Sequence, residues 1–299
     1  MADSAALLRL KRAPGLSVHV NGTRPAGDAD LSRRIARADA VIGVHQTTRF
    51  TRAALEGARR LRLLVVLGDP SESADLEWAT AHGITVSGTP GQDADAVAEH
   101  TLALMLSLAR RVPELDQRVR AGEWPRGLVT QLGGKTLGII GTSAAGQKVA
   151  RLALGIGMNV VTWTPETLAG KGKATPLVEL EELLRTADVV SVHARVSEGT
   201  GRLLGPGQFA LMKPGSFLIH TERAGLVDET ALAHALTGQM IGGAALDVFA
   251  QEPLPADSPL RYLPNVILSP HAAASGAEVL EYSLDAAAAV VLSYFERPP

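Results

Sequence analysis

The chain alternates short apolar runs with amphipathic stretches of helical spacing, and this alternation constrains its fold more than any other feature. In the first quarter, apolar runs at 16–20, 39–44, 62–68 and 83–88 are predicted strands, and the sequences between them are predicted helices. Strands joined by crossover helices run parallel, because each helix returns the chain to the same end of the sheet. The first quarter therefore predicts a small parallel α/β unit.

A second series of the same kind starts at GKTLGIIG (134–141) and ends with NVILSP (265–270). It contains five or six predicted strands with crossover helices, which indicates a Rossmann-type domain. Between the two series, residues 93–122 are predicted to form one long helix of roughly 40 Å, kinked at Pro113. Such a helix suits a spine between domains or a dimer interface.

Composition narrows the classes of partner and location. The 299 residues are 46% hydrophobic, which is enough for two cores, and the net charge of -2 comes from interspersed charges of both signs. That balance favours neither nucleic acid nor an anionic membrane as a partner. The lack of cysteine excludes disulfides, a catalytic thiol and thiolate metal ligands, and we expect no metal site. Without a membrane-spanning apolar run or a signal peptide, a cytoplasmic location is expected.

The segment LGIIGTSAAGQKVA (137–150) is predicted to form a strand, a turn of small residues and the start of a helix. In a dinucleotide-binding domain, such a turn places backbone N–H groups at the helix N-terminus around a pyrophosphate. Gly141 and Gly146 match the first and third glycines of GxGxxG, but Ser143 stands at the second position, where phosphate usually approaches bare backbone. The place of this turn at the start of the second series favours a dinucleotide site over a generic strand–helix turn.

The residue that ends the next strand influences the choice between the two nicotinamide cofactors. An acidic side chain there binds the ribose 2′-hydroxyl and repels a 2′-phosphate. Thr164 occupies this position, and Lys171 and Lys173 follow it. The lysines could neutralise a 2′-phosphate or lie in solvent, so the sequence leaves NAD and NADP both open.

Three polar residues in the last third follow apolar, strand-like runs. They are Arg223 in HTERAGLVDE, Glu252 in GAALDVFAQEPLP and His271 in NVILSPHAAAS. Ligands of open parallel sheets bind at strand ends, although a surface ion pair or a cap is the alternative for each residue. A guanidinium can hold a carboxylate, an imidazole can donate a proton to a carbonyl oxygen, and a carboxylate can stabilise the imidazolium. Together these groups indicate chemistry on a 2-keto acid.

Five segments in the same order resemble the D-isomer-specific 2-hydroxy acid dehydrogenases: TPGQDADAVAEHTLALML, GKTLGIIG, LMKPGSFLIHTERAGLVDE, AALDVFAQEPLP and NVILSPH. The resemblance implies an α/β protein with a Rossmann NAD(P)-binding domain at 93–275. That domain is inserted into a smaller flavodoxin-like substrate domain formed by 1–92 and 276–299, and the protein is expected to be a homodimer. By the same resemblance, Arg223 grips the substrate, His271 is the acid/base and Glu252 is its partner.

The resemblance also implies the ligand-binding residues and the ligands. The cofactor-binding residues are Gly141, Ser143, Ala144, Ala145, Gly146, Thr164, His193, Ala194, Thr221 and Asp247, with Asp247 near the nicotinamide. The substrate loop comprises Gly68, Asp69 and Pro70. The implied cofactor is NAD or NADP, the implied substrate is a small 2-keto or 2-hydroxy acid, and His100 is expected to support packing.

Several residues depart from the family pattern. In the loop LGDPSESAD, which replaces a Gly-rich segment that meets the substrate carboxylate, Pro70 has no N–H and Asp69 adds negative charge unless it points to solvent. In HTERAG, His220 replaces a common Asn and Glu222 replaces a small residue. Glu222 could compete with substrate for Arg223, although alternation along a strand would turn the two side chains apart.

These departures leave a second hypothesis open. Ser143, Thr164 and the acidic LGDPSESAD loop all lie at expected ligand sites rather than in a core. They are compatible with a nucleotide-binding protein of little or no turnover that acts as a sensor or interaction partner. The leading interpretation remains an NAD(P)-dependent reductase of a small 2-keto acid.

Overall fold

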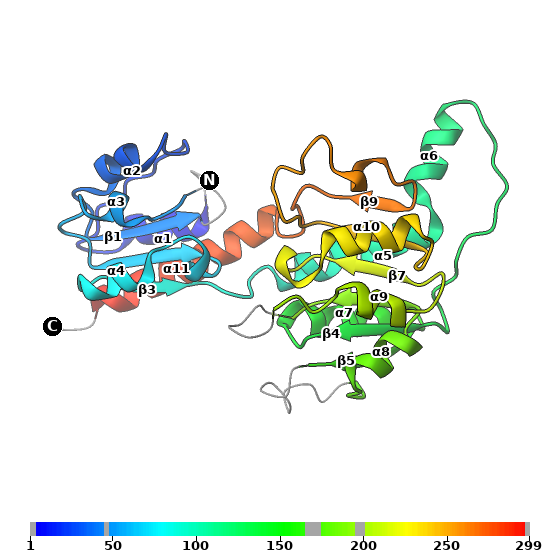
Figure 1. The fold of residues 1–299 in the computed structure, drawn as a ribbon. Helices are drawn as coiled ribbons and strands as arrows, with labels where there is room; N and C mark the ends of the chain where they lie inside the picture. Colours follow the sequence, from blue (N-terminus) through cyan, green and yellow to red (C-terminus); the bar gives the residue numbers. More distant parts are fainter. Residues whose placement is uncertain (1–3, 45–47, 165–174, 195–200, 297–299) are drawn as a thin grey trace. The chain divides into compact units, whose positions relative to one another are not determined.

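The computed structural model describes residues 4–44, 48–164, 175–194 and 201–296. Contacts divide the chain into two compact units, of which unit 1 comprises Met1–Asp93 with Gly276–Pro299 and unit 2 comprises Ala94–Ser275 (Figure 1). Each unit contains its own sheet, and the strand pairs in both sheets are parallel. The predicted α/β fold class is therefore confirmed.

Unit 1 is built on a three-stranded sheet in the order β1-β2-β3. Its elements are α1 (Ala5–Arg12), α2 (Asp28–Ile35), β1 (Ala40–Val44), α3 (Arg52–Leu55), β2 (Leu63–Leu67), η1 (Pro70–Glu72), α4 (Leu76–Ala81), β3 (Thr85–Gly88) and α11 (Ala277–Glu296). The strand predicted at 16–20 is wrong, because these residues have no regular secondary structure. Leu16 and Val18 pack onto the core instead, so their alternation partly buries two side chains without strand pairing.

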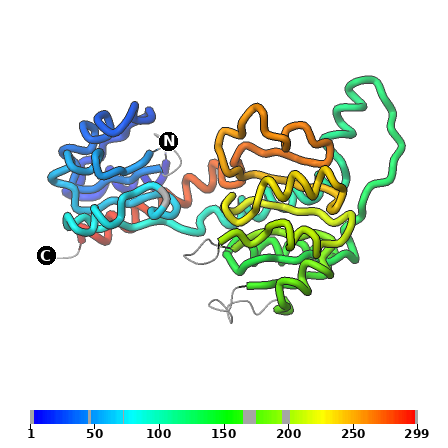
Figure 2. Tube along the Cα trace, viewed as in Figure 1, coloured from blue at the N-terminus to red at the C-terminus, as the bar shows by residue number. Residues whose placement is uncertain are grey.

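Helices cover both faces of the unit 1 sheet. All residues of β2 are apolar and buried, and its successive side chains point to opposite faces. Leu64 and Val66 belong to a cluster with α2, α3 and α4, whereas Leu63 and Val65 belong to a cluster with α1 and α11. Helices α1 and α11 come from opposite ends of the chain and lie side by side (Figure 2). A strand buried on both faces is typical of a parallel sheet covered by helices.

The predicted kinked helix at 93–122 is instead two helices, α5 (Ala94–Arg110) and α6 (Val112–Arg120). Between them Arg111 adopts a left-handed conformation with φ of 52°. Pro113 has no N–H to donate to the carbonyl of Ala109, and its ring would clash with that carbonyl in a continuous helix. The backbone N–H of Thr130 donates to the Ala109 carbonyl instead, at 2.9 Å, so the break leaves this buried acceptor satisfied.

Unit 2 contains a six-stranded sheet in the order β5-β4-β6-β7-β8-β9. Its remaining elements are β4 (Thr136–Ile140), α7 (Ala144–Gly155), β5 (Asn159–Trp163), α8 (Leu180–Thr186), β6 (Val189–Val192), α9 (Pro206–Leu211), β7 (Phe217–His220), η3 (Ala224–Leu226), α10 (Glu229–Thr237), β8 (Gly243–Leu246), η4 (Pro259–Tyr262) and β9 (Val266–Leu268). A single parallel bridge joins Thr162 of β5 to Leu177, on the side of β5 away from β4. With this bridge counted as a reduced strand, the order is that of a Rossmann domain.

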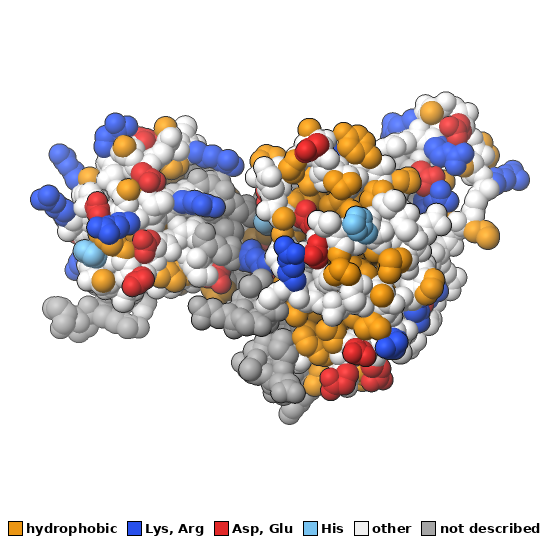
Figure 3. Space-filling model, viewed as in Figure 1, with side chains coloured by type: hydrophobic (Ala, Val, Ile, Leu, Met, Phe, Trp, Pro, Cys, Tyr) orange, Lys and Arg blue, Asp and Glu red, His pale blue; other side chains and the backbone are white. Residues whose placement is uncertain are grey.

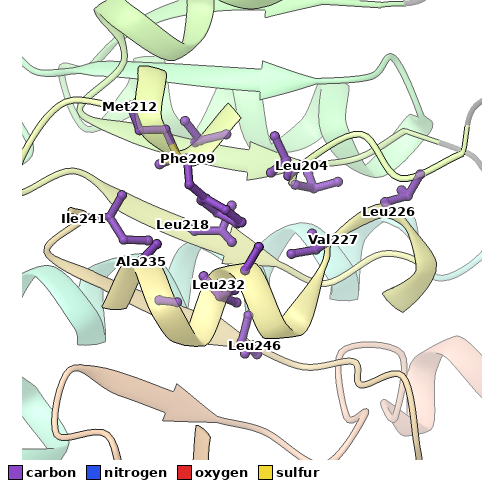
Figure 4. Packing of buried hydrophobic residues seen from close by; sticks show 14 of the residues in the cluster. Leu204, Phe209, Met212, Leu218, Leu226, Val227, Leu232, Ala235, Ile241 and Leu246 are labelled. Carbon is purple, nitrogen blue, oxygen red and sulfur yellow. The ribbon is translucent and has the colours of Figure 1, made fainter. Parts of the chain in front are cut away.

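Two hydrophobic clusters cover the opposite faces of the unit 2 sheet. Helices α5 and α7 pack on one face, and α8, α9 and α10 pack on the other. In the second cluster Phe209 of α9, Leu218 of β7 and Leu232 of α10 converge between the layers (Figure 4). Because this packing fixes all the strands from both sides, their carboxyl ends form one rigid edge where loops can position functional groups.

Candidate functional site

The strand order of unit 2 reverses at β4, because the chain passes from β4 outward to β5 and later returns to β6 on the other side. Ligands of such sheets bind in the crevice at the carboxyl ends of the strands beside this reversal. Gly141 follows β4 at this point, and His193 and Ala194 follow β6. The sequence-predicted nucleotide residues therefore lie at the expected place in the sheet.

The turn after β4 brings the backbone of two strands unusually close. Gly141 has a φ of 106°, and a Cβ atom on it would lie 2.4 Å from the backbone nitrogen of Ala194. Only glycine fits this position. The next helix, α7, begins after Ser143, whose hydroxyl accepts a hydrogen bond from the backbone N–H of Gly146 at 3.1 Å. Ser143 is thus the N-cap of α7, and Ala144 and Ala145 are its first two residues.

The third glycine of the turn is required by a histidine beneath it. A Cβ atom on Gly146 would lie 2.8 Å from Cβ of His193. His193 is fully buried, and its Nε2 is hydrogen-bonded to the Ser191 hydroxyl at 2.8 Å. Its Nδ1 has no hydrogen-bond partner among the described residues. The His193 side chain therefore supports the turn from below and does not face solvent.

Polar side chains also mark the neighbouring strand ends. Thr164 follows β5, and its buried hydroxyl has no hydrogen-bond partner in the part of the chain described. Thr221 follows β7 and shares a 3.0 Å hydrogen bond with the hydroxyl of Thr101 on α5. Lys171 and Lys173 lie outside the described residues. An orphaned hydroxyl at Thr164 and a turn with room only for glycine fit a dinucleotide at this edge.

Glu252 and His271 are in direct contact. Nδ1 of His271 and Oε2 of Glu252 are 2.8 Å apart, and the other carboxylate oxygen of Glu252 accepts from the backbone N–H of Phe249 at 3.1 Å. Both side chains are more than one-third exposed. The contact fixes the orientation of the imidazole and leaves Nε2 as the ring nitrogen that can exchange a proton with a ligand.

Asp247 anchors the loop that carries His271. It follows β8, is fully buried, and accepts hydrogen bonds from the backbone N–H groups of Ala272 at 2.8 Å and Ala273 at 2.9 Å. His271 itself has a φ of 54°, a conformation that is uncommon for a residue with a side chain. The two hydrogen bonds to Asp247 hold Ala272 and Ala273, which directly follow His271. The buried carboxylate therefore fixes the position of the His271 backbone and, through it, the position of the imidazole.

His100 on α5 completes this anchor. Its Nε2 lies 3.0 Å from the Ser269 hydroxyl and 3.3 Å from Oδ1 of Asp247. The sequence predicts only a packing role for His100 and does not point to Ser269. The motif AEHT contains no signal that links His100 to Ser269, which lies 169 positions later, so this contact becomes visible only in the fold.

Arg223 and Glu222 follow β7 at the same edge of the sheet. Arg223 is exposed and precedes η3, and Glu222 is partly exposed. The hydroxyl of Ser143 donates to Oε1 of Glu222 at 3.4 Å. The structure therefore joins Glu252 to His271 and Glu222 to the nucleotide turn, and it places Arg223 after β7, the strand next to β8.

The predicted substrate loop belongs to unit 1. It follows β2, where Gly68 has a φ of 109°. The carboxylate of Asp69 accepts from the backbone N–H of Ser71 at 3.0 Å and from its hydroxyl at 2.7 Å. Pro70 begins η1. Asp69 thus caps its own turn, which accounts for an acidic residue at this position through local structure.

Two buried neutral histidines, His193 and His220, lie at the carboxyl ends of β6 and β7 and make the free energy of unfolding depend on pH. Burial, and to a lesser extent the nearby His220, lowers the pKa of His193 to about 3 from an ordinary value of 6.5. Burial lowers the pKa of His220 to about 4, although backbone groups of Arg223 and Ala224 oppose the shift. The unfolded chain therefore binds protons below pH 6.5 that the folded chain does not bind until pH 3 to 4.

We expect the free energy of unfolding to be highest above pH 6.5 and to fall as the pH decreases toward 4. Well below its pKa in the unfolded chain, each histidine contributes about 1.4 kcal/mol per pH unit to the slope of the unfolding free energy against pH. Urea unfolding at about pH 7 and about pH 5 measures this loss. His220→Asn should reduce the slope, whereas His19→Asn, at an exposed position, should not. Equal slopes in all three proteins would contradict the assignment.

Among the described residues, no group of histidine and acidic side chains could hold a metal ion. None of the described helices is long and apolar enough to cross a membrane. On the face shown in Figure 3, basic and acidic side chains are interspersed, and those of α6 form ion pairs such as Arg120 with Asp116.

Comparison with known families places the matching residues in unit 2. Residues 102–273 match the family described as D-isomer specific 2-hydroxyacid dehydrogenase, NAD binding domain. The chain is 38% identical over 257 residues to D-3-phosphoglycerate dehydrogenase 2, chloroplastic, of Arabidopsis thaliana, covering 84% of this chain and 41% of that protein. It is 34% identical over 282 residues to glyoxylate reductase of Thermococcus litoralis, covering 90% and 85%.

Solved structures also match this chain, and the matches extend over both units. A protein of Thermus thermophilus superposes with a TM-score of 0.88 at 37% identity, covering 97% of this chain and 93% of that one. D-lactate dehydrogenase from Aquifex aeolicus, solved with NAD and lactic acid, superposes with a TM-score of 0.74 at 29% identity, covering 89% and 85%. The chain spans about half the length of the phosphoglycerate dehydrogenases among its curated relatives.

Proposed function

Because the chain belongs to the D-isomer specific 2-hydroxyacid dehydrogenase family, we propose that it interconverts a small 2-keto acid and the D-2-hydroxy acid with NAD or NADP. The observation that carries this proposal is the 2.8 Å contact between Glu252 and His271 at the carboxyl edge of the unit 2 sheet. An imidazole held by a carboxylate is suited to donate a proton to a carbonyl oxygen. The 2-keto acid is not specified by this contact.

In the reduction, His271 donates a proton from Nε2 to the carbonyl oxygen as charge develops there. Glu252 holds the opposite side of the ring, so it orients the imidazole and stabilises its protonated form. The bound cofactor supplies the hydride that reaches the carbonyl carbon. In the reverse direction His271 accepts the hydroxyl proton, and one hydride and one proton are exchanged in either direction. Such a proton donor is typically worth about 10²- to 10⁴-fold in rate.

Arg223 is proposed to bind the substrate carboxylate and to polarise its carbonyl. Its guanidinium carries a permanent charge and can form two parallel hydrogen bonds to a carboxylate. Its position after β7 places it at the strand end next to the one that leads to Glu252. Gly68, Asp69 and Pro70 of unit 1 are proposed as the substrate loop on the basis of the family resemblance.

The cofactor is proposed to occupy the edge beside β4 and β6. Backbone N–H groups of Ala144 and Ala145, at the N-terminus of α7, would meet the pyrophosphate, with Gly141 and Gly146 providing the close approach. The orphaned hydroxyl of Thr164 would face the adenosine ribose. Further proposed contacts come from Ser143, Ala194 and Thr221 and, through their backbone, from His193 and Asp247.

A substrate screen tests the proposed reaction. The full chain would be incubated with glyoxylate, hydroxypyruvate, pyruvate, 2-ketoisocaproate and phenylpyruvate, each with NADH and with NADPH. We expect oxidation of one of the cofactors with at least one keto acid. Cofactor binding by calorimetry without turnover would instead support the non-catalytic sensor hypothesis, and folded protein that binds neither cofactor would contradict both.

We also propose that the protein is a cytoplasmic homodimer formed through α6 and the segment after it. Helix α6 has no buried residues, and the segment 121–131 extends away from the unit 2 sheet (Figures 1 and 2). Trp124 is 77% exposed and Leu128 is 97% exposed. Beside them lies a groove of about 840 Å³ that includes residues of α5 and the segment before β9. Covering these apolar groups with a second copy would remove them from water.

Replacing Trp124 and Leu128 together by Asp should convert the dimer to a monomer. Both side chains are exposed in the single chain, so the double variant should still fold and should show a cooperative unfolding transition. Light scattering after size exclusion measures the mass, and Val20→Asp, an exposed apolar residue in unit 1, is the matched control. A monomeric wild-type chain, or an unchanged mass in the double variant, would contradict this interface.

A further inference from the structure

Glu222 brings a negative charge to the turn that is proposed to bind the cofactor pyrophosphate. Oε1 of Glu222 lies 3.4 Å from the hydroxyl oxygen of Ser143. Glu222 follows β7 and Ser143 follows β4, so the contact joins two loops at the carboxyl edge of the same sheet. The effect of this contact on the turn depends on the other hydrogen bond that the Ser143 hydroxyl makes.

The hydroxyl of Ser143 transmits the contact to the N-terminus of α7. It accepts from the backbone N–H of Gly146 at 3.1 Å, so a lone pair faces the helix and its proton is available for Glu222. Helix N-termini carry a partial positive charge that attracts anions. The Glu222 carboxylate therefore lies one hydroxyl group away from the same positive helix end that a pyrophosphate needs.

From this arrangement we propose that Glu222 weakens dinucleotide binding by competing with the pyrophosphate for the α7 N-terminus. The inference rests on the proposed cofactor site and concerns how tightly that site binds. A carboxylate near the bound pyrophosphate repels it, and its contact with Ser143 must be given up or accommodated when the cofactor enters. Glu222 thus sets the cofactor concentration at which the protein becomes loaded.

The test uses the full chain as wild type, Glu222→Gln and Glu181→Gln, together with Ser143→Gly alone and combined with Glu222→Gln. The Gln variant at 222 keeps the size of the side chain and one accepting oxygen but removes its charge. Glu181 is an exposed carboxylate on α8 in the same unit, so its variant controls for net charge. Calorimetric titration with NADH and with NADPH gives the dissociation constants, and thermal unfolding checks that the folded states are equally stable.

We expect Glu222→Gln to bind the preferred cofactor about tenfold more tightly than wild type, whereas Glu181→Gln binds as wild type does. The gain should shrink in high salt, because the effect is between charges. It should also be smaller when Ser143 is changed to Gly, because the hydroxyl that holds Glu222 at the turn is then gone.

Unchanged or weaker cofactor binding by Glu222→Gln would overturn this inference and leave the proposed function intact. An equal gain in affinity by Glu181→Gln would also overturn it, since the effect would then belong to net charge. Failure of every protein to bind NADH or NADPH would contradict the proposed function, and the inference with it.

Discussion

Replacing His271 by Asn should lower kcat by roughly 10²- to 10⁴-fold, because the side chain that donates the proton is removed. Asn is the suitable replacement because it tolerates the left-handed conformation that His271 adopts, with its φ of 54°. The loop should therefore keep its shape and only the chemistry should change. Steady-state turnover with the keto acid identified in the screen measures the loss.

Two controls separate a chemical effect from a structural one. Calorimetry should show nearly unchanged cofactor affinity, because the nucleotide turn lies at β4 and β6 rather than at β9. His234→Asn, at an exposed position on α10, should retain wild-type turnover. Equal activity in His271→Asn and wild type would show that another group supplies the proton.

The second large effect is expected at Asp247, which acts through His271 rather than on the substrate. Asn at this position has one accepting oxygen, so it can retain only one of the two bonds to Ala272 and Ala273. The lost charge-assisted bond and the unpaired buried groups should lower the free energy of unfolding by about 2 kcal/mol. Displacement of the imidazole should lower kcat by about 100-fold.

The pattern of kinetic changes identifies this role. Asp247→Asn should lower kcat more than it changes KM, because the imidazole is misplaced while Arg223 still binds the carboxylate. Asp257→Asn is a matched control, since this carboxylate lies in the exposed segment before η4. Wild-type turnover in Asp247→Asn would mean that the loop at 271–273 is held by other contacts.

The strands of unit 2 could be predicted from the sequence because each is a short apolar run bounded by glycine, proline or polar residues. The apolar run at 16–20 has the same local pattern, yet Leu16 and Val18 partly bury their side chains without strand pairing. Local periodicity reports which side chains are buried but not which backbone groups are paired. The break at Arg111 has a related cause, because a proline predicts a disturbance and tertiary contacts such as Thr130 to Ala109 decide its form.

The contact between Glu252 and His271 is the part of the site that residue types and strand ends predicted, and it is present. The two residues follow consecutive strands, and parallel strands end at the same edge. The anchoring role of Asp247 could not be predicted, because it depends on backbone N–H groups 25 and 26 residues away. The contact of Glu222 with Ser143 joins residues 79 positions apart and likewise depends on the fold. The sequence suggests only that Glu222 could compete with substrate for Arg223, and it does not predict this contact.

The most direct test of the proposed reaction is isotope transfer in a single incubation. The chain would be given a 2-keto acid and the reduced cofactor deuterated at its transferable position, and the product would be analysed by mass and by chiral chromatography. The proposed mechanism predicts a D-2-hydroxy acid with one deuterium at its second carbon, and loss of this product in His271→Asn. No deuterated product from folded wild-type protein that binds the cofactor, or product formation unaffected by His271→Asn, would contradict it.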